Sequence, residues 1–200
     1  MKFQRIIQLL EITKNKSIFL FGPRRTGKST LLREFCNLEQ NRGRVVYWDL
    51  LDAATYRMFL DDPGALRRIS LSQHAEQVVI DEIQKCPFLL DTVHQMIETD
   101  GIRFILSGSS ARALRRKGVN LLAGRAHAFY LHPLTTAELG DSFDLLRVLN
   151  YGSIPSVYLS DDPQAELEAY VGTYLSEEIA FEGLTRKLPQ FSRFLEVAAL

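Results

Sequence analysis

The sequence predicts an α/β protein in which a doubly wound parallel sheet of five strands is followed by a small helical subdomain. Two observations lead to this fold class. Over the first two thirds of the chain, short apolar runs alternate with longer amphipathic segments, which is the order expected of repeated strand–helix–strand units. After Leu131 only amphipathic segments follow, separated by turns that contain glycine and proline, and this pattern predicts helices alone.

Five segments have the length and the β-branched or aromatic composition of strands that are buried on both faces. They are Ser17–Phe21, Arg44–Leu50, Gln77–Ile80, Arg103–Leu106 and Ala126–Leu131. Helices are expected between them at Ser29–Leu38, Ala53–Leu60, Pro63–Ser70, Phe88–Glu98 and Ser110–Lys117. The last third is expected to form helices at Thr135–Gly140, Asp144–Leu149, Pro163–Glu182 and Gln190–Leu200. We therefore expect two domains, a core at residues 1–139 and a helical region at 140–200.

Composition removes several classes of function. The chain has 24 Lys and Arg against 24 Asp and Glu, so its bulk charge does not attract nucleic acid or an anionic membrane. Its two cysteines, Cys36 and Cys86, lie outside any Cys/His cluster, which argues against a zinc site or a disulfide scaffold and favours the cytoplasm. No run of 18 apolar residues is present, so we expect no membrane-spanning segment and no membrane partner.

The first expected strand is followed by a glycine-rich loop and then by a helix. The loop has the pattern G-x-x-x-x-G-K-S/T in the strand–loop–helix context in which it binds phosphate. Backbone N–H groups at a helix N-terminus, together with a cation, neutralise the charges of a polyphosphate there. We expect Lys28 to bridge the β- and γ-phosphates and the Ser29 hydroxyl to coordinate Mg²⁺. The residues expected to bind the nucleotide are Gly22, Pro23, Arg24, Arg25, Thr26, Gly27, Lys28, Ser29 and Thr30.

The third expected strand carries two adjacent carboxylates, Asp81 and Glu82, at its C-terminal end. Ligands bind at this edge of an open α/β sheet. Asp81 is therefore expected to hold Mg²⁺, and Glu82 to orient an attacking water or accept its proton. This pair favours hydrolysis by water over transfer to a small substrate. Switch-type GTPases need an Asn-Lys-x-Asp base reader, but the only Asn-Lys here, at Asn15, precedes the loop, so an adenine nucleotide, ATP or ADP, is preferred.

The fourth expected strand ends in small polar residues, and a basic stretch follows it. The hydroxyl of Ser107 is expected to contact the attacking water or the γ-phosphate, with a helix N-cap at Ser110 as the structural alternative. The stretch from Arg103 to Arg125 contains six Lys and Arg and no Asp or Glu. It is interpreted as an arginine finger, a surface for nucleic-acid phosphate or a solvated helix face. Arg125, beside Gly124 and a strand, is the better catalytic candidate.

The chain resembles the AAA+ class of P-loop ATPases and, more narrowly, a prokaryotic group of AAA ATPases. Five motifs in the order of that group carry the resemblance. They are Gly22-Pro23-Arg24-Arg25-Thr26-Gly27-Lys28-Ser29, Asp81-Glu82-Ile83-Gln84, Leu106-Ser107-Gly108-Ser109-Ser110, Leu122-Ala123-Gly124-Arg125 and His132-Pro133-Leu134-Thr135-Thr136-Ala137-Glu138. The resemblance implies the strand order 5-1-4-3-2, in which the strand before the loop lies between the fifth and fourth strands. It also implies a helical lid after the core.

The resemblance also implies functional roles. Mg-ATP would be bound and hydrolysed by Lys28, Ser29, Asp81 and Glu82, and Ser107 would act as the sensor on the fourth strand, where many AAA+ proteins have Asn. These proteins commonly take an arginine from a neighbouring subunit, which makes a homo-oligomer an expectation and leaves open whether Arg125 acts in its own subunit or in the next. Members of the group usually continue past the lid into a further domain, so we expect a longer natural protein.

Two functions fit these motifs. The first is an ATPase that couples hydrolysis to a conformational change of itself or of an unknown protein partner. The alternative is a nucleotide-dependent binding switch with slow or no hydrolysis, which binds DNA through the stretch Arg103–Arg125. A small-molecule kinase is a weaker third reading, since no pocket for a phosphate acceptor is evident in the sequence.

Overall fold

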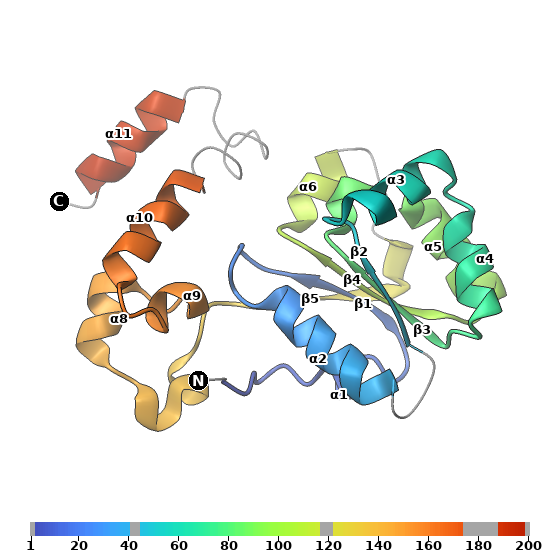
Figure 1. Cartoon of the computed structure of the whole chain (residues 1–200), viewed down its shortest axis with the longest axis horizontal. Helices are drawn as coiled ribbons and strands as arrows, with labels where there is room; N and C mark the ends of the chain where they lie inside the picture. The colour runs from blue at the N-terminus through green and yellow to red at the C-terminus, as the bar shows by residue number, and fades with distance from the viewer. Residues whose placement is uncertain (1–2, 41–44, 117–121, 174–187, 199–200) are drawn as a thin grey trace. The chain divides into compact units, whose positions relative to one another are not determined.

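The computed structural model describes residues 3–40, 45–116, 122–173 and 188–198 (Figure 1). Its described strands form a single sheet in the order β2-β3-β4-β1-β5, and every pairing is parallel. The strands are β1 (Ser17–Phe21), β2 (Val45–Asp49), β3 (Gln77–Asp81), β4 (Arg103–Gly108) and β5 (Ala126–Tyr130). Read from the other edge, this is the expected order 5-1-4-3-2, and the predicted fold class is confirmed.

Helices cover both faces of the sheet (Figure 1). Those within or bordering the sheet domain are α1 (Leu9–Ile12), α2 (Lys28–Gln40), α3 (Ala53–Asp61), α4 (Ala65–Ser72), α5 (Leu89–Thr99), α6 (Ala111–Arg116) and α7 (Thr136–Leu139). Two short 3₁₀ helices, η1 (Ile83–Lys85) and η2 (Leu122–Gly124), precede α5 and β5. The four-residue helix α1 was not expected, and Lys117, expected to end α6, lies outside the described residues.

The sheet separates two hydrophobic cores because successive strand residues point to opposite faces. In β1, Phe19 and Phe21 pack with residues of α3, α4 and α5. Ile18 and Leu20 point the other way and pack with α1 and α2. All of β1 is buried, which explains why its sequence is a continuous apolar run. The C-terminal end of β1 is therefore held rigidly where the glycine-rich loop begins.

The described chain divides into two compact units, the first ending at Glu138 and the second beginning at Leu139. The second unit is helical. Its elements are η3 (Gly140–Ser142), α8 (Leu145–Tyr151), α9 (Pro155–Tyr158), α10 (Pro163–Thr173) and α11 (Leu188–Ala198). The short helix α9 was not expected, and residues 174–182 of the long helix predicted after Pro163 lie outside the described residues.

Tyr158 organises the start of the second unit. Its side chain is buried, and its hydroxyl donates to the Ser142 carbonyl at 2.5 Å and accepts the N–H of Asp144 at 2.9 Å. Arg147 donates through Nε to the Tyr158 carbonyl at 2.8 Å. These contacts connect η3, α8 and α9. Within the described residues, no helix is long and apolar enough to cross a membrane.

Replacing Gly22 with alanine is expected to destabilise the first unit. A Cβ at this position would overlap the carbonyl oxygen of Leu131, and both groups belong to backbone that the sheet holds in place. Overpacking of this kind costs about 1–3 kcal/mol. The single tryptophan, Trp48 of β2, packs edge-on against Phe59 at 5.1 Å, so its fluorescence during urea unfolding reports on this unit.

The matched control is Gly172→Ala. Gly172 lies in α10, where a Cβ would meet nothing within 4 Å. The same change should leave the Trp48 transition where it is in the wild type, while Gly22→Ala lowers the urea midpoint. Equal midpoints for the two variants would contradict the close approach of Gly22 to Leu131.

Candidate functional site

The glycine-rich loop connects β1 to α2 and closes on the side chain of Lys28. The Lys28 ammonium donates to the carbonyl of Gly22 at 2.7 Å and to that of Pro23 at 2.8 Å. The Thr26 hydroxyl also donates to the Pro23 carbonyl, at 2.8 Å. Lys28 is buried although it is cationic, so the loop holds a positive charge in its interior.

The backbone of the loop turns sharply to reach the helix. Arg25 and Gly27 have φ values of 61° and 91°, and a non-glycine residue in this left-handed region is uncommon and is held there by its surroundings. The Leu31 N–H donates a helical hydrogen bond to the Gly27 carbonyl of the loop at 2.9 Å. The N–H groups of the first turn of a helix have no carbonyl partner within it and favour an anion.

Asp81 ends β3 and is fully buried. Its two oxygens accept hydrogen bonds from hydroxyl groups on the two neighbouring strands: Ser107 of β4 donates to Oδ1, and Tyr47 of β2 donates to Oδ2 at 3.0 Å. Burial raises the pKa of Tyr47, and the nearby Asp81 carboxylate raises it further. The phenol therefore stays protonated and remains a donor to the carboxylate.

Glu82 follows Asp81 in a left-handed conformation, with φ 63° and ψ 45°. Its N–H donates to the Ser107 hydroxyl at 3.1 Å, and its carboxylate accepts a hydrogen bond from the Gln84 side-chain amide. Gly108 makes room for Gln84, because a Cβ there would lie 2.7 Å from the Gln84 Oε1. The turn after β3 thus fixes both the backbone and the carboxylate of Glu82.

The pKa of Glu82 is affected by charged residues of the glycine-rich loop. Burial raises the pKa of this carboxyl above its usual value, and the Asp81 carboxylate adds to the increase. The Lys28 ammonium and, more weakly, Gln84 and Arg24 act in the opposite direction. Lys28 and Arg24 are therefore close enough to Glu82 to act on its charge, and a raised pKa makes a carboxylate a better proton acceptor.

Most of the predicted site residues lie at the C-terminal ends of the strands. The loop follows β1, Asp81 and Glu82 follow β3, and Ser107 lies in β4 between them. Ser29 and Thr30 lie in the first turn of α2, directly after Lys28. The structure thus brings together the loop, the acidic pair and the candidate sensor that sequence motifs identified separately.

Arg125 lies at the other end of the strands, where β1 and β5 begin. It immediately precedes β5, whose first residue, Ala126, pairs with Ser17 at the start of β1, and a five-residue strand is about 16 Å long. Its guanidinium forms an ion pair with Glu98 at the end of α5. Action of Arg125 on a nucleotide in the same subunit does not fit this position, whereas action in a neighbouring subunit stays a prediction.

Two polar residues of the site were not identified from the sequence. In the sequence, Tyr47 is one aromatic residue of an expected strand, and strands favour aromatics. Its contact with Asp81 depends on the register Asp49↔Asp81 of β2 and β3. Gln84 appeared only as part of the Asp-Glu-Ile-Gln motif. In the sequence, only the spacing of two residues between Glu82 and Gln84 indicates that their side chains could be in contact.

A family model described as AAA domain matches residues 14–140 of the chain. The chain belongs to this AAA domain family. The matched residues contain all five strands and every site residue described above. No curated protein matches the chain significantly.

A solved structure of a replication initiator shows the same fold. The replication initiator DnaA, bound to AMPPCP and single-stranded DNA, is 18% identical with a TM-score of 0.50 over 91% of this chain and 62% of that chain. Cdc6p from Pyrobaculum aerophilum is 17% identical, with a TM-score of 0.46 over 67% and 45%. The AAA domain chain therefore spans less than two thirds of the length of these proteins, and at this identity the likeness concerns the α/β P-loop fold alone.

Replacing Ser107 with alanine is expected to destabilise the AAA domain. The change removes a donor from the buried Asp81 carboxylate and an acceptor from the Glu82 N–H, and unsatisfied buried polar groups cost about 1–3 kcal/mol. The control is Ser70→Ala in α4, because the buried Ser70 hydroxyl has no hydrogen-bond partner among the described residues. Urea unfolding followed by Trp48 fluorescence should show a lower free energy of unfolding for Ser107→Ala but not for Ser70→Ala. Similar decreases for both variants would contradict the hydrogen-bond network around Ser107.

Proposed function

We propose that this AAA domain binds Mg-ATP in the loop between β1 and α2 and hydrolyses it. The observation that carries the proposal is the buried Lys28, which lies inside a phosphate-binding loop and acts on the charge of Glu82 beyond it. A cation and a carboxylate that share one sheet edge are suited to hold a polyphosphate and the water that attacks it.

Lys28 is the proposed phosphate ligand. Its ammonium already has two oxygen partners, the carbonyls of Gly22 and Pro23. Phosphate oxygens carry more negative charge than carbonyls, and hydrogen bonds between charged groups are roughly twice as strong as neutral ones. A bound nucleotide would therefore compete successfully for the ammonium, helped by the first-turn N–H groups of α2.

The donor set at this edge fits Mg²⁺. The proposed ligands are the Ser29 hydroxyl and the Asp81 carboxylate, both oxygen donors of the type that this ion prefers. Asp81 is buried and held by two hydroxyl groups, so its orientation is fixed before any ligand binds. When bound, the ion would neutralise charge on the phosphate oxygens.

Glu82 is the proposed catalytic residue. Its raised pKa, caused first by burial, suits a group that orients water and accepts its proton. Gln84 holds the carboxylate from one side, and Ser107 holds the Glu82 backbone. Ser107 would sense the γ-phosphate through this shared network, since its hydroxyl contacts both Asp81 and Glu82.

An adenine nucleotide is proposed on two grounds. The sequence has no Asn-Lys-x-Asp base reader after the loop. In addition, the DnaA structure with this fold was solved with AMPPCP, an analogue of ATP. What the ATPase acts on is proposed to be a protein partner, with hydrolysis coupled to a conformational change.

Nucleic-acid binding through Arg103–Arg125 has less support. Arg103 donates to the carbonyls of Thr13 and Lys14, and Arg125 is paired with Glu98. Lys117 lies outside the described residues. Two of the six cations of this stretch thus hold the domain together, which favours the ATPase over a DNA-binding switch.

Two substitutions should separate binding from hydrolysis. Lys28→Ala should weaken ATP binding by about 10- to 100-fold, because it removes charge-assisted hydrogen bonds worth about 1.5–3 kcal/mol. Glu82→Gln should keep binding but lower turnover by about 10²- to 10⁴-fold, the usual contribution of a general base. Binding is measured with a fluorescent ATP analogue and turnover by phosphate release.

Lys14→Ala is the matched control for loss of a cation. Lys14 is exposed and paired with Glu11 three residues away, and such surface pairs contribute little. This variant should bind and hydrolyse ATP as the wild type does. Undiminished phosphate release in both Lys28→Ala and Glu82→Gln would overturn the assignment of the site.

A further inference from the structure

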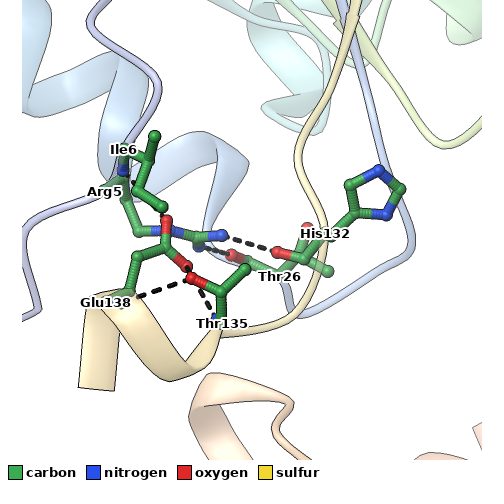
Figure 2. Close-up of polar contacts among 6 residues, drawn as sticks. All are labelled: Arg5, Ile6, Thr26, His132, Thr135 and Glu138. Carbon is green, nitrogen blue, oxygen red and sulfur yellow. Dashed lines mark hydrogen bonds and ion pairs between the residues drawn. The ribbon is translucent and has the colours of Figure 1, made fainter. Parts of the chain in front are cut away.

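The guanidinium of Arg5 joins three segments that are far apart in the sequence. It donates through Nε to Glu138 Oε1 at 2.8 Å, through one terminal nitrogen to the Thr26 carbonyl at 2.6 Å and through the other to the His132 carbonyl at 2.5 Å (Figure 2). Thr26 belongs to the phosphate-binding loop, His132 follows β5, and Glu138 lies in α7. One side chain before the first strand thus contacts the loop directly.

Glu138 is the anchor of this contact. Its Oε1 also accepts the Ile6 N–H at 3.0 Å, and its Oε2 accepts the Thr135 N–H at 2.9 Å (Figure 2). In return, the Thr135 hydroxyl accepts the Glu138 N–H at 3.2 Å, which is the reciprocal capping box of a helix N-terminus. The cap accounts for Oε2 alone, whereas Oε1 is directed at Arg5 and Ile6.

The ion pair is almost completely removed from water. The exposed fraction is 9% for the Arg5 side chain and 4% for that of Glu138. Burial by itself raises the pKa of Glu138, but the N–H groups of Thr135 and Ile6 together with Arg5 outweigh it, and the net pKa is lowered. The pair is therefore charged at neutral pH, and removing one partner would leave the charge of the other without its counter-charge in a position with little access to water.

The contact with Thr26 fixes one peptide group of the loop. In a planar trans peptide the carbonyl and the following N–H point in opposite directions. When Arg5 holds the Thr26 carbonyl, the Gly27 N–H points away from the guanidinium. A Cβ at Gly27 would lie 3.7 Å from the same arginine nitrogen, so the guanidinium lies against this part of the loop.

We propose that Arg5, anchored by Glu138, is a positioning residue that orients the Thr26–Gly27 peptide and so turns the Gly27 N–H toward bound phosphate. The inference rests on the proposed function of the loop in binding ATP. Arg5 does not itself contact the phosphate. It acts through the loop backbone, and its guanidinium geometry matters because three acceptors must be reached at once.

The test compares Arg5→Met with a matched variant elsewhere in the first compact unit. Arg67 forms a similar two-pronged ion pair with Asp100, at 2.8 and 2.9 Å, and Arg67→Met removes it. Two properties are measured for each protein: the affinity for a fluorescent ATP analogue in the presence of Mg²⁺, and hydrogen exchange of the Leu31 amide, which is bonded to the Gly27 carbonyl.

Arg5→Met should weaken nucleotide binding by about tenfold and speed exchange at Leu31 by a similar factor, the effect of losing one charge-assisted hydrogen bond to the loop. Arg67→Met should change neither property. Combining Arg5→Met with Glu138→Gln should add little, because the two residues act as one unit. Equal effects of Arg5→Met and Arg67→Met at Leu31 would overturn the proposal.

Arg5→Lys decides the outcome if Arg5→Met does not fold. Lysine keeps the charge next to Glu138 but lacks the planar fork that reaches Thr26 and His132, so this variant should fold and still show faster exchange at Leu31. Unchanged exchange would again overturn the proposal. If the wild type binds no nucleotide, the proposed function fails, and the exchange measurement still decides whether Arg5 orders the loop.

Discussion

A carboxylate at the end of a fully buried strand is costly unless each of its oxygens finds a donor. At Asp81 the donors are the hydroxyl groups of Tyr47 and Ser107, one from each neighbouring strand. The parallel pairing makes this possible. Asp49 of β2, two residues after Tyr47, pairs with Asp81 of β3, and Ser107 of β4 follows Leu106, which pairs with Ile80. The same Ser107 hydroxyl accepts the Glu82 N–H. The two acids are therefore fixed together, in a network whose members depend on one another.

The strand order determines which groups this network can act on. Because β4 lies between β1 and β3, the loop after β1 and the acids after β3 are separated by two strand spacings, about 10 Å at their backbones. The Lys28 side chain spans part of that separation, and its charge reaches Glu82. A cation within the loop and a carboxylate of raised pKa after β3 thus lie at the C-terminal ends of two strands that are separated by one other strand. This arrangement is a property of the sheet and does not depend on the second unit.

The strands of the AAA domain could be predicted to within two residues at either end, because each is a short apolar run between polar turns. The loop, Asp81, Glu82 and Ser107 could also be predicted, since the motifs place them at strand ends. Register-dependent contacts such as Tyr47 with Asp81 could not, and α1 and α9, of four residues each, are too short to show helical periodicity. In a parallel sheet β5 runs in the same direction as β1, so Arg125, which precedes β5, must lie at the N-terminal ends of the strands. Its partner Glu98, on a different element, has no signature in the sequence.

The ion pair between Arg5 and Glu138 links residues that are 133 positions apart. Of the contacts of Glu138, the sequence indicates only the local one, the Thr-x-x-Glu cap of α7. A buried pair tolerates no partial separation, because each partner would keep an uncompensated charge. The Arg5 guanidinium therefore connects the segment before β1, the Thr26 carbonyl and α7. Glu138 is also the last residue of the first unit, so the backbone leaves this unit next to a residue that is connected to the phosphate-binding loop through Arg5.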